Sequence, residues 1–140
     1  DMSARGTISG LTRGSNRNHI VRAALESIAF QVNDLVDSIL SDIDWGISSL
    51  QVDGGATANN FLMQFQSDIL QLKIDRPSNI ESTALGIGML AGIGSEFWKN
   101  QKDLESIRET DKIFEPVMDV QTRKSLLQNW HQAVKRTCFN

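Results

Sequence analysis

The sequence predicts an α/β domain in which helices pack on a small, mostly parallel sheet. Apolar residues recur at helical spacing over residues 19–41 and again over residues 58–70, which are the expected main helices. Two short apolar runs stop abruptly, as strands do: 50–52 ends at a glycine pair and 73–75 ends at an Arg-Pro pair. Strands that alternate with helices are typical of parallel sheets, because parallel neighbours need a crossover connection.

Length and composition indicate a globular unit. The chain has 140 residues, of which 40% are hydrophobic and 22% are charged, so it can bury a core. Its 14 Lys and Arg side chains against 17 Asp and Glu give a net charge of -3. This balance argues against a basic face, so we expect no nucleic-acid partner. Composition alone is compatible with a whole protein and with a piece of one.

Features of membrane and secreted proteins are not expected. The longest weakly polar run, residues 84–94, is about half of the ~20 residues that a membrane span needs. The opening residues, DMSARGT, lack the basic and apolar regions of a signal peptide, and the lone Cys138 excludes an internal disulfide. We therefore expect no membrane partner and a cytoplasmic location.

The first third of the chain is expected to begin with a short strand or an ordered loop over residues 5–11. A Gly-Ser-Asn stretch at 14–16 then precedes the helix expected over 19–41, for which Asn18 is the expected N-cap. The apolar stripe of this helix is wide, which predicts burial on more than one side. Residues 41–49 are polar and predict a loop.

The turn after the first strand carries the candidate binding residues. The run that ends at residue 52 suits a buried parallel strand. Gly54 and Gly55 allow a backbone to approach a ligand closely, and the following helix turns its positive end to the same place. The Asn59 side-chain amide can both donate and accept, which suits the edge of a purine base. A tight turn in which Asn59 or Asn60 only caps the helix explains the pattern equally well.

The second half of the chain is expected to contain two helices joined by a charged linker. A helix capped by Ser82 or Thr83 is expected to run to Trp98, with glycines along one face. A glycine in a helix costs about 1 kcal/mol relative to alanine, so this face predicts the close approach of another backbone. Residues 99–116 are expected to form an exposed linker, and an outer amphipathic helix is expected to start near Thr122.

A GxGxxA string lies in the first of these two helices, at residues 86–91. A dinucleotide fingerprint of this kind needs a strand that runs into its first glycine and a helix that follows. Here the glycines lie inside the expected helix, so we interpret them as packing residues. The chain contains no GxxxxGK[ST] string, which excludes a P-loop within it.

No group of residues predicts catalysis or metal binding. His19 and His131 have no partners at metal-ligand spacing and are interpreted as surface or capping residues. A loose group of arginines near the start of the first helix is interpreted as solvated or intersubunit surface. Neither an acid–base pair nor an activated nucleophile is evident, so we assign no catalytic and no metal-binding residue.

Several strings resemble the FGGY family of carbohydrate kinases. GTISGL, seven further residues and then HIVRAALE resemble the second signature of that family. Within the family, GLTRG, HIVRAALESIAFQ, VDGGATANNFLMQFQSDIL and ESTALGIGMLAG resemble glycerol kinases more narrowly. The resemblance covers residues 5–136 and is strongest over 10–70. One of its few departures is Thr57, where valine or serine is more familiar.

The resemblance implies a partial actin/hexokinase-like (ribonuclease H-like) ATPase fold. Such kinases have two domains, and ATP and the polyol meet in the cleft between them. Residues 1–140 resemble only the later part of the second domain, which agrees with the small number of expected strands. The catalytic, glycerol-binding and phosphate-binding residues of the family lie earlier in its sequence than the part that this chain resembles.

The resemblance also implies ligands and partners. In the family, the loop that matches Gly54 and Gly55 lies against the nucleotide, and the residue that matches Asn59 contacts the adenine. We therefore predict that Gly54, Gly55 and Asn59 bind ATP or ADP. The Mg²⁺ ion is expected to be held by the phosphates and by residues outside this chain. ATP, glycerol and the preceding part of the kinase are the implied partners, and a homo-oligomer is expected.

The activity implied for the parent protein is transfer of the γ-phosphoryl group of Mg·ATP to glycerol, giving glycerol 3-phosphate. Two alternatives stay open. One is another FGGY sugar kinase, such as a xylulokinase, although the string NNFLMQFQSD argues against it. The other is a non-catalytic nucleotide-binding or interaction fragment, which is the behaviour expected of the isolated 140 residues.

Overall fold

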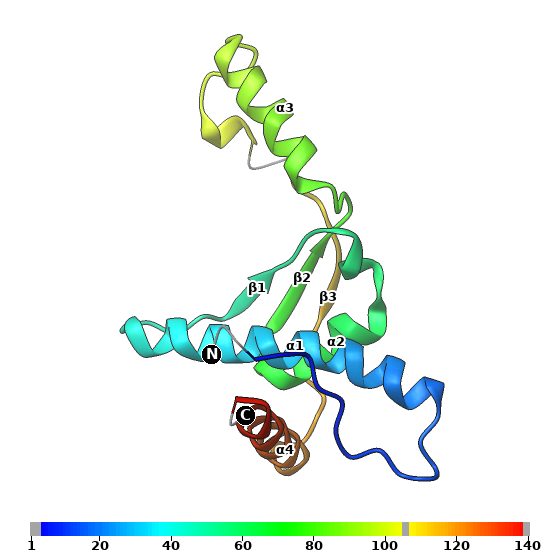
Figure 1. Cartoon of the computed structure of the whole chain (residues 1–140). Coiled ribbons are helices and arrows are strands. Elements are labelled where there is room, and N and C mark those ends of the chain that lie inside the picture. Colours follow the sequence, from blue (N-terminus) through cyan, green and yellow to red (C-terminus); the bar gives the residue numbers. More distant parts are fainter. Residues whose placement is uncertain (1–3, 105–106, 139–140) are drawn as a thin grey trace.

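The computed structural model describes residues 4–104 and 107–138. Helix α2 packs against the sheet, and α1 and α4 pack against α2, whereas α3 projects from the far end of the sheet (Figure 1). In chain order the elements of the described residues are α1 (Arg17–Asp42), β1 (Ser49–Gln51), the 3-10 helix η1 (Gly55–Ala58), α2 (Asn60–Leu70), β2 (Lys73–Pro77), α3 (Ser82–Gly94), the 3-10 helix η2 (Gln101–Leu104), β3 (Thr110–Phe114) and α4 (Val120–Cys138).

The sheet has the strand order β1-β2-β3. β1 and β2 are parallel, with Leu50 opposite Ile74, because η1 and α2 form the crossover between them. β2 and β3 are antiparallel, with Ile74 opposite Phe114, and their register shifts between Arg76 and Pro77. The parallel pair brings the residue after β1 and the residue after β2 to the same end of the sheet.

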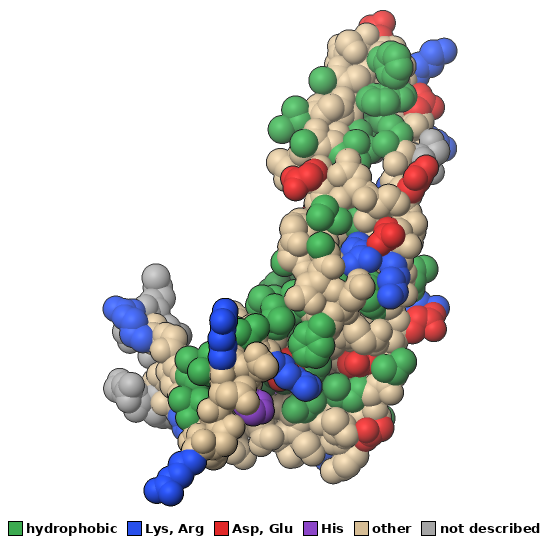
Figure 2. All heavy atoms as spheres, turned by 90° about the vertical axis from the view of Figure 1, so that its right-hand side faces the viewer, with side chains coloured by type: hydrophobic (Ala, Val, Ile, Leu, Met, Phe, Trp, Pro, Cys, Tyr) green, Lys and Arg blue, Asp and Glu red, His purple; other side chains and the backbone are tan. Residues whose placement is uncertain are grey.

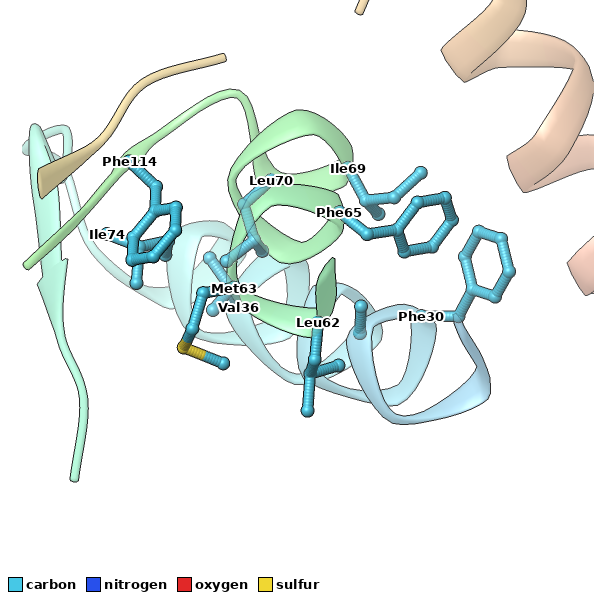
Figure 3. Close-up of a cluster of buried hydrophobic side chains, with 10 residues drawn as sticks. Phe30, Val36, Leu62, Met63, Phe65, Ile69, Leu70, Ile74 and Phe114 are labelled. Carbon is cyan, nitrogen blue, oxygen red and sulfur yellow. The ribbon is translucent and has the colours of Figure 1, made fainter. Parts of the chain in front are cut away.

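The hydrophobic core lies between α1, α2 and the sheet (Figure 3). Phe30 of α1 meets Phe65 of α2 edge to face, with their ring centroids 5.4 Å apart. From the sheet, Ile74 and Phe114 complete the core, with 0% and 3% of their surfaces exposed. The other buried apolar residues of this cluster are Ala29, Val36, Leu62, Met63, Ile69 and Leu70. The two helices expected from apolar spacing therefore supply most of the core, as their patterns indicate.

The long helix starts earlier than expected. Asn16, and not Asn18, is the N-cap of α1: its side-chain oxygen accepts from the backbone N–H groups of Asn18 and His19 at 3.0 and 3.3 Å. The His19 ring accepts from the Asn16 backbone N–H at 3.1 Å, which completes a reciprocal cap and confirms a capping role for His19. Residues 5–11 form no strand, so the ordered-loop alternative holds for this segment.

The prediction that residues 99–116 form a linker is wrong, because this segment contains η2 and β3. β3 makes the sheet mixed where a mostly parallel sheet was expected. The apolar pattern of the sequence does not predict β3, because four of its residues are exposed and only Phe114 is buried. β1 also differs from the expected buried strand: it is an edge strand whose residues are exposed or half-buried. Among the described residues it pairs on one side only, which leaves its other edge open.

α3 stands apart from the core as an arm (Figure 1). It ends at Gly94 and not at Trp98, and neither Ser82 nor Thr83 caps it, because the N-cap position is Glu81. Hydrophobic side chains are exposed along the arm, as its space-filling surface shows (Figure 2); they include Ile87, Leu90 and Phe97. None of the described helices is both long and apolar enough to cross a membrane.

The glycine face of α3 has no neighbour among the described residues. A Cβ atom added at Gly86 or Gly88 would meet nothing within 4 Å. Gly92 is the exception, because a Cβ there would overlap the ring of Trp98. The chain folds back at this point, and the Phe97 and Trp98 backbone N–H groups donate to the Gly92 carbonyl at 2.9 and 3.2 Å. The close backbone approach expected along the whole face is therefore not made within the described part of the chain.

The last helix is attached to the core by polar bonds as well as apolar contacts. Trp130 stacks on Phe30 with ring centroids 5.3 Å apart. Arg123 donates to the Ile69 carbonyl at 2.6 Å and to the Asn33 side-chain oxygen at 3.4 Å. Asn33 is 1% exposed, so the bond to Arg123 and its own bond to Asp37 at 2.8 Å satisfy a buried amide. α4 starts at Val120, close to the expected Thr122.

Candidate functional site

The candidate site is the turn between β1 and α2, at the carboxyl end of the parallel strand pair. Gly54 has φ 85° and ψ 162°, a backbone conformation that is essentially restricted to glycine. Its N–H donates to the Ile80 carbonyl at 2.8 Å, which ties the turn to the segment after β2. Gly55 is exposed, and a Cβ added there would meet nothing within 4 Å. The glycine pair thus makes the turn and leaves open space in front of Gly55.

Thr57 closes the turn from inside. Both its hydroxyl and its backbone N–H donate to the Gly54 carbonyl, at 2.7 and 3.0 Å. Only 4% of Thr57 is exposed, so these bonds are shielded from water and hold the turn in one shape. The hydroxyl explains how threonine is accommodated at a position where the family resemblance leads one to expect valine or serine.

Asn59 is the N-cap of α2, one of the two roles that the sequence left open. Its side-chain oxygen accepts from the backbone N–H groups of Phe61 and Leu62 at 3.0 and 3.2 Å. The residue is exposed, and its side-chain nitrogen has no hydrogen-bond partner among the described residues. The two roles are therefore compatible, because the cap uses the side-chain oxygen and leaves both amide hydrogens available as donors.

Arg76, at the end of β2, joins this turn to the sheet. Its Nη1 atom donates to the Thr57 carbonyl at 3.0 Å and to the Asn60 side-chain oxygen at 2.9 Å. Its Nε and Nη2 atoms lie 2.8 and 2.6 Å from an oxygen of Asp111 on β3. The elements η1, α2, β2 and β3 thus meet at a single guanidinium group.

A second ion pair lies beside the first. Arg108 donates to the Asp75 carboxylate at 2.8 Å and to the Asp75 carbonyl at 3.1 Å. The hydrogen bond from Arg108 holds the pKa of the Asp75 carboxyl below its usual range, and the Thr110 hydroxyl adds to this effect against the opposing influence of burial. Asp75 is thereby kept ionised where β2 meets β3.

A cavity of about 660 Å³ opens beside the turn. It lies between the carboxyl ends of β1 and β2 and the first half of α3, and Asp53, Ser78, Leu85, Met89, Ile107 and Arg108 are among the residues that line it. Asp53 links the cavity to the turn, but neither Gly55 nor Asn59 lines it. This cavity and the candidate residues are thus neighbours that do not coincide.

The remaining candidates of the sequence are not gathered at this site. His131 contacts Asp34 at 3.3 Å on the opposite side of the molecule from α3, and His19 caps α1. Arg22 of the arginine group pairs with Glu26 at 2.6 Å and lies over the Phe61 ring. Within residues 4–104 and 107–138, no group of three His, Cys, Asp or Glu side chains is arranged to hold a metal ion.

Sequence reasoning missed Arg76, which it treated only as the end of a strand. A usable signal existed: parallel strands end at the same edge of a sheet, so residues that follow one strand lie near those that follow its neighbour. An arginine at the end of the second strand is therefore placed to reach the turn after the first. The ion pair of Arg76 with Asp111 was not predictable, because the sequence did not indicate β3.

Comparison with known proteins agrees with this architecture. A model of the C-terminal domain of the FGGY family of carbohydrate kinases matches residues 1–95. The chain is 53% identical over 136 residues to a glycerol kinase from Thermoanaerobacter pseudethanolicus, and 53% identical over 137 residues to one from a Shewanella species. These matches cover 97% and 98% of the chain, which spans only 27% and 28% of the length of these curated relatives.

Solved structures extend the likeness to the fold. The crystal structure of a glycerol kinase from Plasmodium falciparum with ADP matches 99% of the chain and 28% of that protein, with a TM-score of 0.85 and 41% identity. A xylulose kinase from Lactobacillus acidophilus matches 98% of the chain and 28% of that protein, with a TM-score of 0.79 at 21% identity, which shows the shared fold alone. The expected actin/hexokinase-like fold is thereby confirmed, and with a family match over more than half of its residues, the chain belongs to the FGGY family of carbohydrate kinases as part of their C-terminal domain.

Proposed function

We propose that the chain is part of an ATP-dependent glycerol kinase and forms the adenosine-binding side of its interdomain cleft. The reaction of the whole protein is transfer of the γ-phosphoryl group of Mg·ATP to a terminal hydroxyl of glycerol, giving ADP and glycerol 3-phosphate. The observation that carries this proposal is 53% identity to a glycerol kinase over 97% of the chain. The Plasmodium relative that was solved with ADP supports nucleotide binding.

Gly54, Gly55 and Asn59 are the proposed nucleotide contacts. Open space in front of Gly55 suits the close approach of a ligand to the backbone. The free side-chain nitrogen of Asn59 is a donor to an acceptor nitrogen on the adenine edge. Because phosphoryl transfer depends mainly on positioning and electrostatics, holding the adenosine end aligns the γ-phosphate with its acceptor.

Glycerol, Mg²⁺ and the acid–base chemistry are assigned to other parts of the kinase. Mg²⁺ is proposed to be held by the phosphates and by residues outside these 140. No side chain of the described residues is assigned to catalysis, so the contribution of this segment is to bind and orient. That division predicts a specific signature, in which changes at the turn alter nucleotide affinity and leave glycerol affinity unchanged.

The remainder of the kinase polypeptide is the proposed partner of the exposed apolar surfaces. Within the part of the chain that the structure describes, β1 has an unpaired edge, and α3 exposes Ile87 and Leu90 at 65% and 71% beside an open glycine face. A glycine face accepts a closely packed neighbour, and an open strand edge accepts another strand. A homo-oligomer of the whole kinase remains a further prediction, which sedimentation velocity of the full-length protein tests.

Two variants of Asn59 test the site in the full-length kinase. Asn59→Ala removes both the cap and the proposed donor, whereas Asn59→Ser keeps a capping oxygen and removes only the amide. We expect both to weaken ADP binding in calorimetry by about tenfold, because a buried acceptor on the base loses its donor. Glycerol affinity is expected to stay unchanged.

Asn16→Ser is the matched control. Asn16 caps α1 through the same pair of bonds as Asn59 makes at α2, at 3.0 and 3.3 Å. The same substitution there changes a cap without touching the proposed site. Unchanged ADP affinity in Asn59→Ser, or equal losses in Asn59→Ser and Asn16→Ser, would remove Asn59 from the nucleotide site.

Substrate choice separates glycerol kinase from other FGGY sugar kinases. Three xylulose kinase structures are 21–24% identical to the chain, well below its 53% identity to a glycerol kinase, so glycerol is the favoured acceptor. Rates of ADP formation with glycerol and with xylulose, measured on the full-length enzyme, decide between them. A preference for xylulose would contradict the proposal.

A further inference from the structure

We propose that Arg76 is a positioning residue that fixes the adenosine-binding turn and so sets the affinity for the nucleotide but not the affinity for glycerol. The inference rests on the proposed function, because it takes Gly54, Gly55 and Asn59 as nucleotide contacts. Arg76 is given no contact with the ligand. It acts through the backbone that carries these contact residues.

Arg76 holds the turn on both sides of Asn59. Its Nη1 atom donates to the carbonyl oxygen of Thr57 at 3.0 Å and to the side-chain oxygen of Asn60 at 2.9 Å. Thr57 belongs to η1, and Asn60 is the first residue of α2. One nitrogen therefore links the 3-10 turn that begins at Gly55 to the helix that Asn59 caps, which restrains the separation of Gly55 and Asn59.

The other side of the guanidinium group is anchored to the sheet. Nε and Nη2 approach the Asp111 carboxylate at 2.8 and 2.6 Å, and the guanidinium carbon lies 5.3 Å from the centre of the Phe114 ring. Phe114 is part of the core, and only 12% of the Arg76 side chain is exposed. Charge-assisted bonds in such a site are stronger and better ordered than exposed ones. Arg76 thus connects the turn to the sheet and to a residue of the hydrophobic core.

Only arginine can make these contacts together. The planar guanidinium group presents five N–H donors in a fixed fork, so one edge can meet Asp111 while the other meets Thr57 and Asn60. A lysine ammonium is a single point with three donors on a flexible stem. It can reach the carboxylate or the turn, but it does not hold both in one plane.

Arg108 provides a matched control in the same part of the sheet. It also pairs with a carboxylate, Asp75, at 2.8 Å, and it also joins β2 to the chain around β3. Its other hydrogen bonds within the described part of the chain are with the Asp75 carbonyl and the Thr110 hydroxyl, so none of them reaches residues 54–60. Substitution of either arginine removes an ion pair, but only substitution of Arg76 frees the turn.

A restraint on the adenosine end predicts a particular kinetic pattern. The adenosine contacts are the same in the ground state and in the transition state, so weakening them raises the KM for ATP and leaves kcat unchanged. Glycerol is bound elsewhere in the proposed kinase, so its KM should not respond. A general loss of folding would instead lower the active fraction and reduce kcat for both substrates together.

The experiment compares variants of the full-length kinase. We expect Arg76→Met to raise the KM for ATP about tenfold and to change kcat and the KM for glycerol by less than about twofold, as loss of a charge-assisted hydrogen bond would do. Arg76→Lys should lie between the parent and Arg76→Met. Arg108→Met should change the KM for ATP by less than about twofold. Equal rises in Arg76→Met and Arg108→Met, or an equal rise in the two KM values, would overturn the inference.

Asn60→Ala keeps the test decisive if Arg76→Met fails to fold. It removes one of the two acceptors on the turn and leaves the Asp111 pair intact, so a rise of about threefold in the KM for ATP is expected from one weakened hydrogen bond. No rise in Asn60→Ala together with none in Arg76→Lys would refute the positioning role.

A double-variant cycle distinguishes failure of this inference from failure of the proposed function. If Arg76 acts through Asn59, adding Arg76→Met to Asn59→Ser should lower ADP affinity less than the product of the single effects. Normal ADP affinity in Asn59→Ser would reject the nucleotide site itself. Weakened ADP binding in Asn59→Ser with fully multiplicative effects in the double variant would reject only the role of Arg76.

Discussion

The indole N–H of Trp130 donates to the Asp34 carboxylate at 2.7 Å and thereby joins the last helix to the first. We expect Trp130→Phe to keep the stacking on Phe30 and to lower the free energy of unfolding by about 1 kcal/mol, the value of one hydrogen bond. Trp130→Ala also loses the ring and should cost about 3 kcal/mol. Urea unfolding of the full-length protein measures both. Trp45→Phe is the control, because Trp45 is 70% exposed.

Asp68 holds the connection between β3 and α4. One of its carboxylate oxygens accepts from the backbone N–H groups of Val117 and Met118 at 2.7 and 3.1 Å, and Asp68 is 7% exposed. Asp68→Ala should lower the free energy of unfolding by about 3 kcal/mol, because it leaves shielded donors without an acceptor. Asp68→Asn keeps an oxygen and should cost about 1 kcal/mol. Asp44→Ala, at an exposed position, should leave the free energy of unfolding unchanged. Equal losses of stability in Asp68→Ala and Asp44→Ala would contradict the structural role of Asp68.

The two glycines of the turn should respond differently to alanine. Gly54→Ala places a side chain at φ 85°, so we expect a loss of about 1–3 kcal/mol in unfolding free energy. Gly55→Ala meets open space and should change stability by less than about 1 kcal/mol. If Gly55 faces the nucleotide, Gly55→Ala should nevertheless weaken ADP binding. Urea unfolding and calorimetry on the same preparations compare the two, and an unchanged ADP affinity in Gly55→Ala would count against the site.

Asp75 should make part of the stability depend on acid pH. Arg108 holds the pKa of its carboxyl below the usual range, so the folded state favours the carboxylate. This contribution is complete above the unfolded-state pKa of about 3.9 and disappears as the pH falls through the lower folded-state pKa. Asp75→Asn should therefore be less stable than the parent at pH 7, and the difference should shrink below about pH 4. Urea unfolding from pH 7 to pH 3 tests this; a constant difference would exclude the titration.

The isolated 140 residues should not phosphorylate glycerol. They are proposed to supply the adenosine side of the cleft only, so an acceptor cannot be aligned with the γ-phosphate. A coupled assay for ADP release with glycerol and Mg·ATP measures this, with the full-length kinase as the positive control. Glycerol-dependent turnover by the purified segment would overturn the assignment of catalysis to other parts of the protein.

The sequence was most informative where one face of an element is buried. The apolar spacing in α1 and α2 predicted the helices that form the core, and the glycine pair predicted the turn after β1. β3 was missed because Phe114 is its one buried residue, so its sequence carries no alternating pattern. The cap of α1 was misplaced by two residues, because Asn16 and Asn18 offer the same side chain and only the backbone decides between them.

The sequence located the turn that carries the proposed contact residues, but not the side chain that supports this turn. Gly54, Gly55 and Asn59 stood out from a local pattern, which their positions in one turn reflect. Arg76 depends on strands that are distant in sequence, because its partner Asp111 lies 35 residues away. Local patterns do not report such long-range pairing. The sequence left two roles open for Asn59, a helix cap and a contact with the adenine. The structure shows the cap, and the side-chain nitrogen that the cap does not use is compatible with the adenine contact.

The folding of Trp98 onto Gly92 gives the α3 arm an optical reporter of its own. The three tryptophans of the sequence lie in separate regions: Trp45 in the loop after α1, Trp98 in the segment that folds back after α3 and Trp130 between α4 and the core. A variant that keeps only Trp98 should emit from the arm alone. Its emission wavelength and its quenching by iodide then follow the arm as it meets the rest of the kinase, with no added label.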